Sequence, residues 1–145
     1  LSRSAFRRRL RHYNREMKDD QGYAFFIFRD SDLALLGGLT LSNVRRGVTQ
    51  AAALGYWLGA PHVQQGHMSL AVAAALPFVF DELKLHRLEA ACLPHNVASI
   101  RVLEANGFTH EGLARRYLKI DGVWLDHLLF ALVADDPRQR RGGGL

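Results

Sequence analysis

The chain has 145 residues, of which 48% are hydrophobic and 23% are charged, with a formal net charge of +5. This length predicts one domain that is large enough to bury a core. No run of about 18 apolar residues occurs, which excludes a membrane-spanning helix. The arginine-rich start has no apolar run after it, so we expect no secretory signal. Because the lone Cys92 cannot form an internal disulfide, we expect a cytoplasmic protein.

The positive charge is concentrated at the two ends of the chain. The basic residues concerned are Arg3, Arg7, Arg8, Arg9, Arg11, Arg15, Lys18, Arg138, Arg140 and Arg141. A basic surface suits polyanions, so the first segment is a candidate contact for RNA or a ribosome. A solvated helix face followed by a basic tail accounts for the same charges without a partner. Both interpretations stay open.

The first half of the chain predicts one helix and three strands. Apolar residues recur every three to four positions over 4–17, which predicts a helix with its arginines on the other side. An aromatic and apolar run predicts a strand over 23–28, with an antiparallel partner over 33–41. A polar loop over 42–47 and a third strand over 48–58 follow.

The second half changes to a strand–helix–strand pattern and ends in a hairpin. Pro77 removes an amide donor inside the first helix, where we expect a kink or a broken turn. Asp121-Gly122 is a strong two-residue turn signal. These elements predict an α+β fold (α/β in some schemes) in one domain over 1–133, with a disordered tail over 134–145. The predicted elements are helices over 66–85 and 96–105, and strands over 87–93, 108–114, 115–120 and 123–133.

The loop from Val63 to Met68 leads from the third strand into a helix. The start of a helix presents free backbone amides and the positive end of the helix dipole, which suit a pyrophosphate. Gly66 would let the backbone come close to such an anion. Taken alone, one glycine before a helix is more often plain helix capping.

Four stretches of the chain, in order and spacing, carry a resemblance to a known family. They are 55–59 (GYWLG), Gly66, 94–99 (PHNVAS) with 104–108 (EANGF), and 111–112 (EG) with 121–127 (DGVWLDH). From residue 47 to residue 132 the chain resembles the RimJ/RimL branch of the GNAT acetyltransferases, which acetylate the N-termini of ribosomal proteins. The resemblance implies a mixed, mostly antiparallel sheet flanked by helices. The chain begins with Leu1 inside the family's first helical region, so we expect the usual first strand to be absent.

The resemblance also implies that acetyl-CoA is the co-substrate. The family's phosphate-binding pattern falls on residues 63–68, where Gly66 matches while Val63 and Met68 depart from it. In the family, pantetheine pairs with the preceding strand, and an asparagine and a serine on the next helix complete the site. Asn96 also fits a helix N-cap, which is compatible with that role. The cofactor-binding residues implied in this way are Trp57, Leu58, Gln64, Gln65, Gly66, His67, Met68, Asn96 and Ser99.

The catalytic side chains are less clearly defined than the cofactor loop. Many GNAT enzymes protonate the departing thiolate with a tyrosine, whose place here is Leu103, and some relatives use a glutamate that falls near Leu118. Ser99 remains as the candidate that assists the thiolate. Glu89 is a candidate base acting through water, although a solvent-facing or ion-paired strand residue fits it equally well.

Three further functions remain open beside acetylation of a protein N-terminus. One is acetylation of a small-molecule amine, which would favour an acidic acceptor cleft. Another is a GNAT-fold binding module with little or no catalysis, and a third is RNA binding through the basic first helix. No metal is expected, because His67, His95 and His127 lack metal-ligand spacing.

Overall fold

The structure is a computed structural model that describes residues 15–28, 32, 34–59 and 66–138. Its six strands form one sheet in the order β1-β2-β3-β4-β6-β5. Only β3 and β4 are parallel, and every other neighbouring pair is antiparallel. The strands are β1 (Tyr23–Phe28), β2 (Leu35–Arg45), β3 (Ala51–Leu58), β4 (Arg87–Cys92), β5 (Thr109–Ile120) and β6 (Val123–Val133). The predicted mixed and mostly antiparallel sheet is therefore confirmed.

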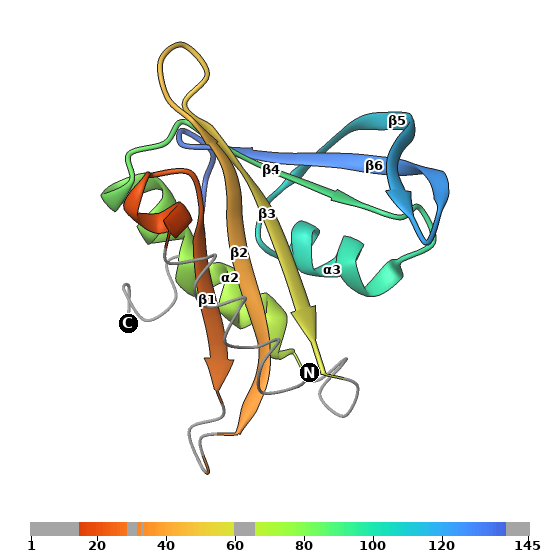
Figure 1. The fold of residues 1–145 in the computed structure, drawn as a ribbon, viewed down its shortest axis with the longest axis horizontal. Helices are drawn as coiled ribbons and strands as arrows, with labels where there is room; N and C mark the ends of the chain where they lie inside the picture. The colour runs from red at the N-terminus through yellow and green to blue at the C-terminus, as the bar shows by residue number, and fades with distance from the viewer. Residues whose placement is uncertain (1–14, 29–31, 33, 60–65, 139–145) are drawn as a thin grey trace.

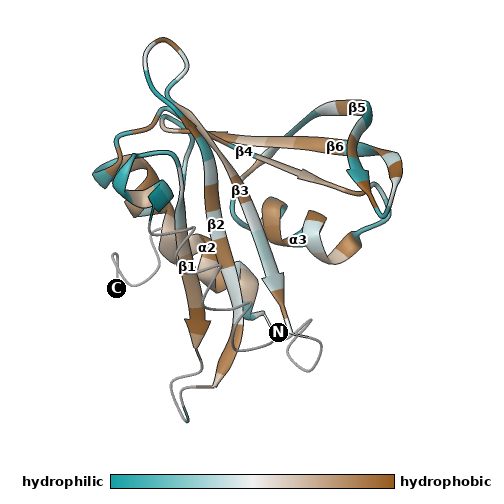
Figure 2. Ribbon diagram, in the orientation of Figure 1, coloured by the Kyte–Doolittle hydropathy of each residue, from teal (hydrophilic) through white to brown (hydrophobic). Residues whose placement is uncertain are grey.

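Two helical segments cross between strands, and both contribute side chains to one core. Helix α2 (His67–Pro77) continues into a short π-helix, η2 (Phe78–Glu82), while α3 (Val97–Ala105) follows β4. Alternate residues of the strands pack with apolar residues of these helices in one core. Figure 2 shows hydrophobic segments, in brown, along both the strands and the helices. The fully buried members are Leu39, Leu41, Ala52, Val72, Val79, Leu85, Leu88, Leu103 and Leu132.

The predicted break at Pro77 is confirmed. The α-helix ends at Pro77, and the next turn is a π-helix in which the Leu83 amide donates to the Phe78 carbonyl at 2.8 Å. Pro77 has no amide proton to donate to Ala73, so the regular hydrogen-bond ladder cannot continue through it.

Two boundaries in the first half differ from the sequence-based expectation. The polar loop predicted over 42–47 is wrong for its first part, because β2 continues to Arg45 through an irregular register after Ser42. Asn43 takes a positive φ of 51° there, which lets polar residues stay in a bulged strand. The third strand starts at Ala51 rather than at residue 48.

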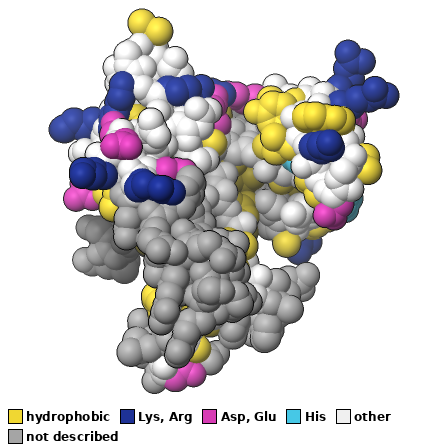
Figure 3. All heavy atoms as spheres, viewed as in Figure 1, with side chains coloured by type: hydrophobic (Ala, Val, Ile, Leu, Met, Phe, Trp, Pro, Cys, Tyr) yellow, Lys and Arg dark blue, Asp and Glu magenta, His cyan; other side chains and the backbone are white. Residues whose placement is uncertain are grey.

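Strands β5 and β6 form the closing hairpin, and its turn lies at Asp121-Gly122 as the sequence predicts. Asp121 and Gly122 have φ values of 50° and 81°, as a two-residue turn of this kind requires. The two extended pieces expected before it form the single strand β5, with register shifts after His110 and Ala114. Figure 3 shows hydrophobic side chains gathered over this hairpin. Large hydrophobic residues that are exposed on it include Leu113, Tyr117, Leu118, Val123 and Trp124.

Both ends of the chain lie partly outside the described residues. Of the helix predicted over 4–17, residues 15–17 are described and helical, and the basic residues before Arg15 lie outside the described part. The first five residues of the predicted tail pack on the domain. The Ala134 amide donates to the His86 carbonyl at 2.8 Å, and the Arg138 guanidinium lies 5.0 Å from the centre of the Phe80 ring. Residues 139–145 are not described.

The structure described for residues 15–28, 32, 34–59 and 66–138 contains no helix that is long and apolar enough to cross a membrane.

The glycine pair in β2 generates a first prediction. A Cβ at Gly37 would overlap the backbone carbonyl oxygen of Trp57, whereas a Cβ at Gly38 would meet the Trp57 indole nitrogen at 2.7 Å. The paired backbone of Trp57 cannot move aside, whereas its indole side chain can rotate. We expect Gly37→Ala to lower the free energy of unfolding by roughly 1–3 kcal/mol, and Gly38→Ala by less. Urea unfolding measures both, and equal costs would contradict the close approach of the two backbones.

Candidate active site

The central feature of the site is the separation of the two parallel strands. Four residue pairs join β3 to β4, and the last of these pairs Leu54 with Ala90. Beyond it β3 stays paired with β2 as far as Leu58, and β4 stays paired with β6 as far as Cys92. Figure 1 shows the two halves of the sheet diverging from this point, with α3 beneath the gap.

The second half of β3 turns backbone groups toward this gap. The Gly59 amide donates to the Leu36 carbonyl of β2 at 2.9 Å. Because backbone direction alternates along an antiparallel strand, the amides of Tyr56 and Leu58 point to the opposite edge. That edge faces β4 only as far as Leu54, so these two amides face the gap.

A cavity of about 630 Å³ opens at the gap. The last residues of β3 form one wall, the first turn of α2 another, and one side of α3 the third. The lining residues are Tyr56, Trp57, Leu58, Gly66, Met68, Ser69, Asn96, Val97, Ala98, Ser99, Arg101, Val102 and Ala105. Among these described residues Arg101 alone carries a charge, so the cavity has a mostly apolar lining and one cation.

The first turn of α2 presents its amides at this cavity. Gly66 caps the helix with φ 77° and ψ −2°, a left-handed conformation that favours glycine. The first intrahelical bond runs from the Leu70 amide to the Gly66 carbonyl at 3.3 Å, so the helix ladder does not use the amides of Met68 and Ser69. The positive end of the helix dipole strengthens the attraction of these amides for an anion. This helix end therefore suits an anion.

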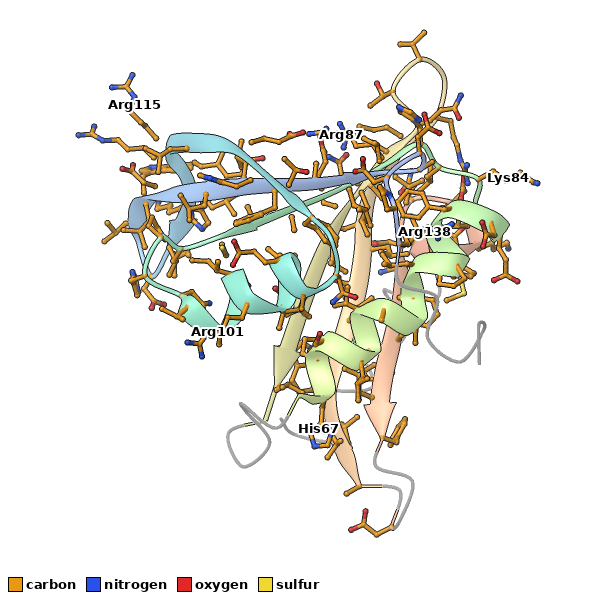
Figure 4. The ribbon with its side chains drawn as sticks, turned by 180° about the vertical axis from the view of Figure 1, so that it is seen from behind. His67, Lys84, Arg87, Arg101, Arg115 and Arg138 are labelled. Carbon is orange, nitrogen blue, oxygen red and sulfur yellow. The ribbon has the colours of Figure 1, made fainter. Side chains whose placement is uncertain are left out.

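The start of α3 is fixed by a side-chain cap. The Asn96 side-chain oxygen accepts a hydrogen bond from the Ser99 amide at 3.1 Å, as expected for an N-cap. Ser99 is only 8% exposed, although its side chain lines the cavity. Arg101, on the same helix, also lines the cavity, and Figure 4 shows its side chain extending from α3 away from the sheet.

Tyr56 is the main residue that the sequence analysis missed. Its hydroxyl lies 2.5 Å from the Ser99 hydroxyl oxygen and joins β3 to α3 across the end of the gap. Strand alternation places Tyr56 on the same face as Ala52 and Leu54, the face that packs on the helices, and this signal could have found it. Burial raises the pKa of Tyr56, so the phenol keeps its proton at neutral pH.

A buried amide holds the two helices around the cavity. The Asn106 side-chain nitrogen donates to the Ser69 carbonyl at 3.2 Å and to the Val102 carbonyl at 2.9 Å. Asn106 itself keeps φ at −97°, and Gly107 takes the left-handed position with φ 84°. Asn106 therefore ties the end of α3 to the beginning of α2, rather than acting only as a helix stop.

Glu89 lies outside the cavity, in a network of ion pairs. It contacts Arg45 at 2.5 Å and Arg87 at 2.8 Å, while Arg87 also pairs with Glu111. Its neighbours Leu88 and Ala90 face the core, so Glu89 faces away from α3. Burial alone would raise the pKa of Glu89, but hydrogen bonds from the two arginines outweigh it and lower that pKa. A carboxylate with a lowered pKa is a weak base, and the structure does not support that role.

The structure thus brings together most of the residues predicted for the site. Trp57, Leu58, Gly66, Met68, Asn96 and Ser99 line the cavity. His67 begins α2 without lining the cavity, and Gln64 and Gln65 lie outside the described residues. Cys92 is buried, and burial raises the pKa of its thiol, so a reactive thiolate is not favoured. Within the described part of the chain, no three His, Cys, Asp or Glu residues gather as a metal site.

Comparison with known proteins decides the family. The model of the acetyltransferase (GNAT) domain matches residues 1–109. The chain belongs to the GNAT acetyltransferase family. This family uses acetyl-CoA as its co-substrate, and the chain is an N-acetyltransferase domain.

Individual relatives lie close to this GNAT domain. It is 43% identical to the Bacillus subtilis protein named "Probable N-acetyltransferase YjcK" over 133 residues, which are 92% of this chain and 74% of the relative. It is 36% identical over 133 residues to the [ribosomal protein uS5]-alanine N-acetyltransferase of Escherichia coli, covering 92% of this chain and 69% of that protein. The solved structure of Mycobacterium smegmatis RimJ with CoA-disulfide matches with a TM-score of 0.85 and 35% identity, covering 90% of this chain and 62% of that chain.

The ion-pair network of this acetyltransferase domain generates a second prediction. Because the folded state lowers the pKa of Glu89 below its usual value of about 4.3, the network stabilises the fold above that pH and loses this contribution as the pH falls through the lowered pKa. We expect Glu89→Gln to lower the melting temperature at pH 7, with the difference from the unmodified chain shrinking as the pH falls below about 4.3 and vanishing only below the lowered pKa. Melting curves from pH 3 to 7 test this. A large loss of turnover at unchanged stability would instead restore Glu89 as the base.

Proposed function

We propose that this domain transfers the acetyl group of acetyl-CoA to the N-terminal α-amine of a protein, with a ribosomal protein as acceptor. The observation that supports this proposal is the cavity at the separated ends of β3 and β4. One wall of the cavity is a helix end that suits phosphate, and another has backbone amides that suit a pantetheine chain. The acceptor is supported by the Escherichia coli relative named for the alanine of ribosomal protein uS5, to which the chain is 36% identical.

The lining residues fit the parts of acetyl-CoA. The amides of Met68 and Ser69 would bind its pyrophosphate. The space beside Gly66 is open, because a Cβ built there would meet no atom within 4 Å. Arg101 would face the phosphates as the one charged residue of the lining. Along the gap, the Tyr56 backbone and the Leu58 carbonyl would pair with the amides of pantetheine, as a missing strand would.

The departure of Met68 from the family's small residue is compatible with this fit. Met68 is 5% exposed and belongs to the core between α2 and the sheet. Its side chain therefore fills space under the helix, while its amide still belongs to the first turn. Phosphate binding of this kind needs the amide rather than the side chain.

The reaction is direct attack of the neutral amine on the thioester carbonyl. A peptide α-amine has a pKa near 8, so a water chain has to remove only a modestly held proton, while a lysine amine near 10 would demand more. The Leu58 amide, which points into the gap, is the donor for the developing oxyanion. Ser99 donates its proton to the departing sulfur. Positioning of two substrates supplies most of the remaining acceleration.

Calorimetry and acceptor assays test the proposal together. Acetyl-CoA is titrated into the chain, and acetylation is then measured for peptides that begin with alanine or serine, a lysine side-chain peptide and spermidine. We expect binding, and a kcat/KM for one N-terminal peptide at least about tenfold above that for spermidine. A preference for spermidine would indicate the small-molecule acceptor. No binding at millimolar acetyl-CoA would indicate a module that has lost the co-substrate.

A substitution at Ser99 tests its role in the reaction. We expect Ser99→Ala to lower kcat about 100-fold, because the departing thiolate loses its proton donor, while the Kd for acetyl-CoA changes little. The matched control is Ser42→Ala, which removes a hydroxyl from an exposed position of β2. Steady-state kinetics with calorimetry separates the two effects, and unchanged turnover would remove Ser99 from the mechanism.

A further inference from the structure

A pair of hydroxyl groups closes the inner end of the cavity. The Tyr56 hydroxyl lies 2.5 Å from the Ser99 hydroxyl oxygen, and 3.4 Å from the Ser99 carbonyl oxygen. Both residues line the cavity, one from β3 and the other from α3. A separation of this size is at the short end for a hydrogen bond between two hydroxyls.

The positions of the two hydroxyls are fixed by α3 on one side and by β3 on the other. Asn96 fixes the Ser99 backbone through the N-cap, and Ser99 is 8% exposed. Tyr56 is half-buried and follows Leu54, the last β3 residue paired with β4. The phenol therefore reaches α3 from the place where the two strands separate.

We infer that Tyr56 is a positioning residue of the acetyl transfer, whose hydroxyl donates to Ser99 and directs the Ser99 proton to the sulfur of acetyl-CoA. This inference rests on the proposed function, since it assigns a role within the same reaction. Leu103 stands on α3 where many GNAT enzymes have a catalytic tyrosine, and it is fully buried in the core. This role of Tyr56 explains how the chain can have an apolar residue there, because its phenol comes from β3 instead.

The proton balance shows why Ser99 needs such a partner. The amine nitrogen forms the C–N bond, and the C–S bond breaks with its electron pair on sulfur. An aliphatic hydroxyl is about as weak an acid as water, so Ser99 alone cannot readily protonate a thiolate of pKa about 8.5. A phenol, whose usual pKa is about 10, is a closer match than an aliphatic hydroxyl, even though burial raises the pKa of Tyr56.

In the relay the Ser99 proton moves to sulfur while the Tyr56 proton moves to the Ser99 oxygen. The proton that the acceptor nitrogen loses then returns through water to Tyr56, so no charge is left on the protein. Tyr56 enters each cycle as a donor, because its burial keeps the phenol protonated at neutral pH.

The test is a double-mutant cycle on the full chain, with Tyr56→Phe, Ser99→Ala and both together. We expect Tyr56→Phe to lower kcat roughly 10- to 100-fold while the Kd for acetyl-CoA stays within about twofold. The double variant should be no slower than Ser99→Ala, because the phenol acts only through Ser99. Tyr56→Leu should show the same kcat loss, so that the test does not depend on a single substitution.

The matched control is Tyr23→Phe, which removes another tyrosine hydroxyl that bonds to Asp20 at 2.5 Å away from the cavity. It should lower stability without changing kcat. An unchanged kcat in Tyr56→Phe, or losses that multiply in the double variant, would overturn this inference while leaving acetyl transfer intact. A chain that binds no acetyl-CoA and acetylates no acceptor would overturn the proposed function, and the role of Tyr56 with it.

Discussion

Hydrogen bonding between β3 and β4 stops after four residue pairs, and the rest of the site depends on this interruption. A parallel pair that continued would use the amides of Tyr56 and Leu58 in the sheet and leave no opening for a ligand. Since β2 and β6 continue to support the separated strands, the opening costs no further strand pairing. The cavity thus begins where the sheet itself opens, and α2 and α3 complete its walls.

Three sets of contacts hold the opening in its geometry. The glycines of β2 allow Trp57 to lie against that strand, Asn106 ties α3 to α2, and the hydroxyls of Tyr56 and Ser99 join β3 to α3. The contacts of Asn106 with Ser69 and of Tyr56 with Ser99 link residues that lie 37 and 43 positions apart along the chain. Rigid walls of this kind place an amine and a thioester together without a strong base, and positioning is the main demand of this reaction.

The sequence predicted the strands, the break at Pro77 and the Asn96 cap, because each depends on local periodicity or on one residue's backbone preference. It missed the continuation of β2 to Arg45, where a bulge lets polar residues remain in a strand. It also proposed Glu89 as a base, although Glu89 alternates with Leu88 and Ala90, which face the core, and therefore lies on the opposite face of β4. The bond from Tyr56 to Ser99 spans 43 positions, and no local pattern reports such a contact.

Nuclear magnetic resonance of the chain during titration with acetyl-CoA tests the central claim most directly. If the gap between β3 and β4 binds the co-substrate, the largest shifts should fall on the amides of Leu58, Ser69 and Ser99. The amides of Glu89 and Glu111, on the opposite face and the edge strand, should change little. Shifts that cluster on β1 and β2 while these three amides stay still would contradict the account.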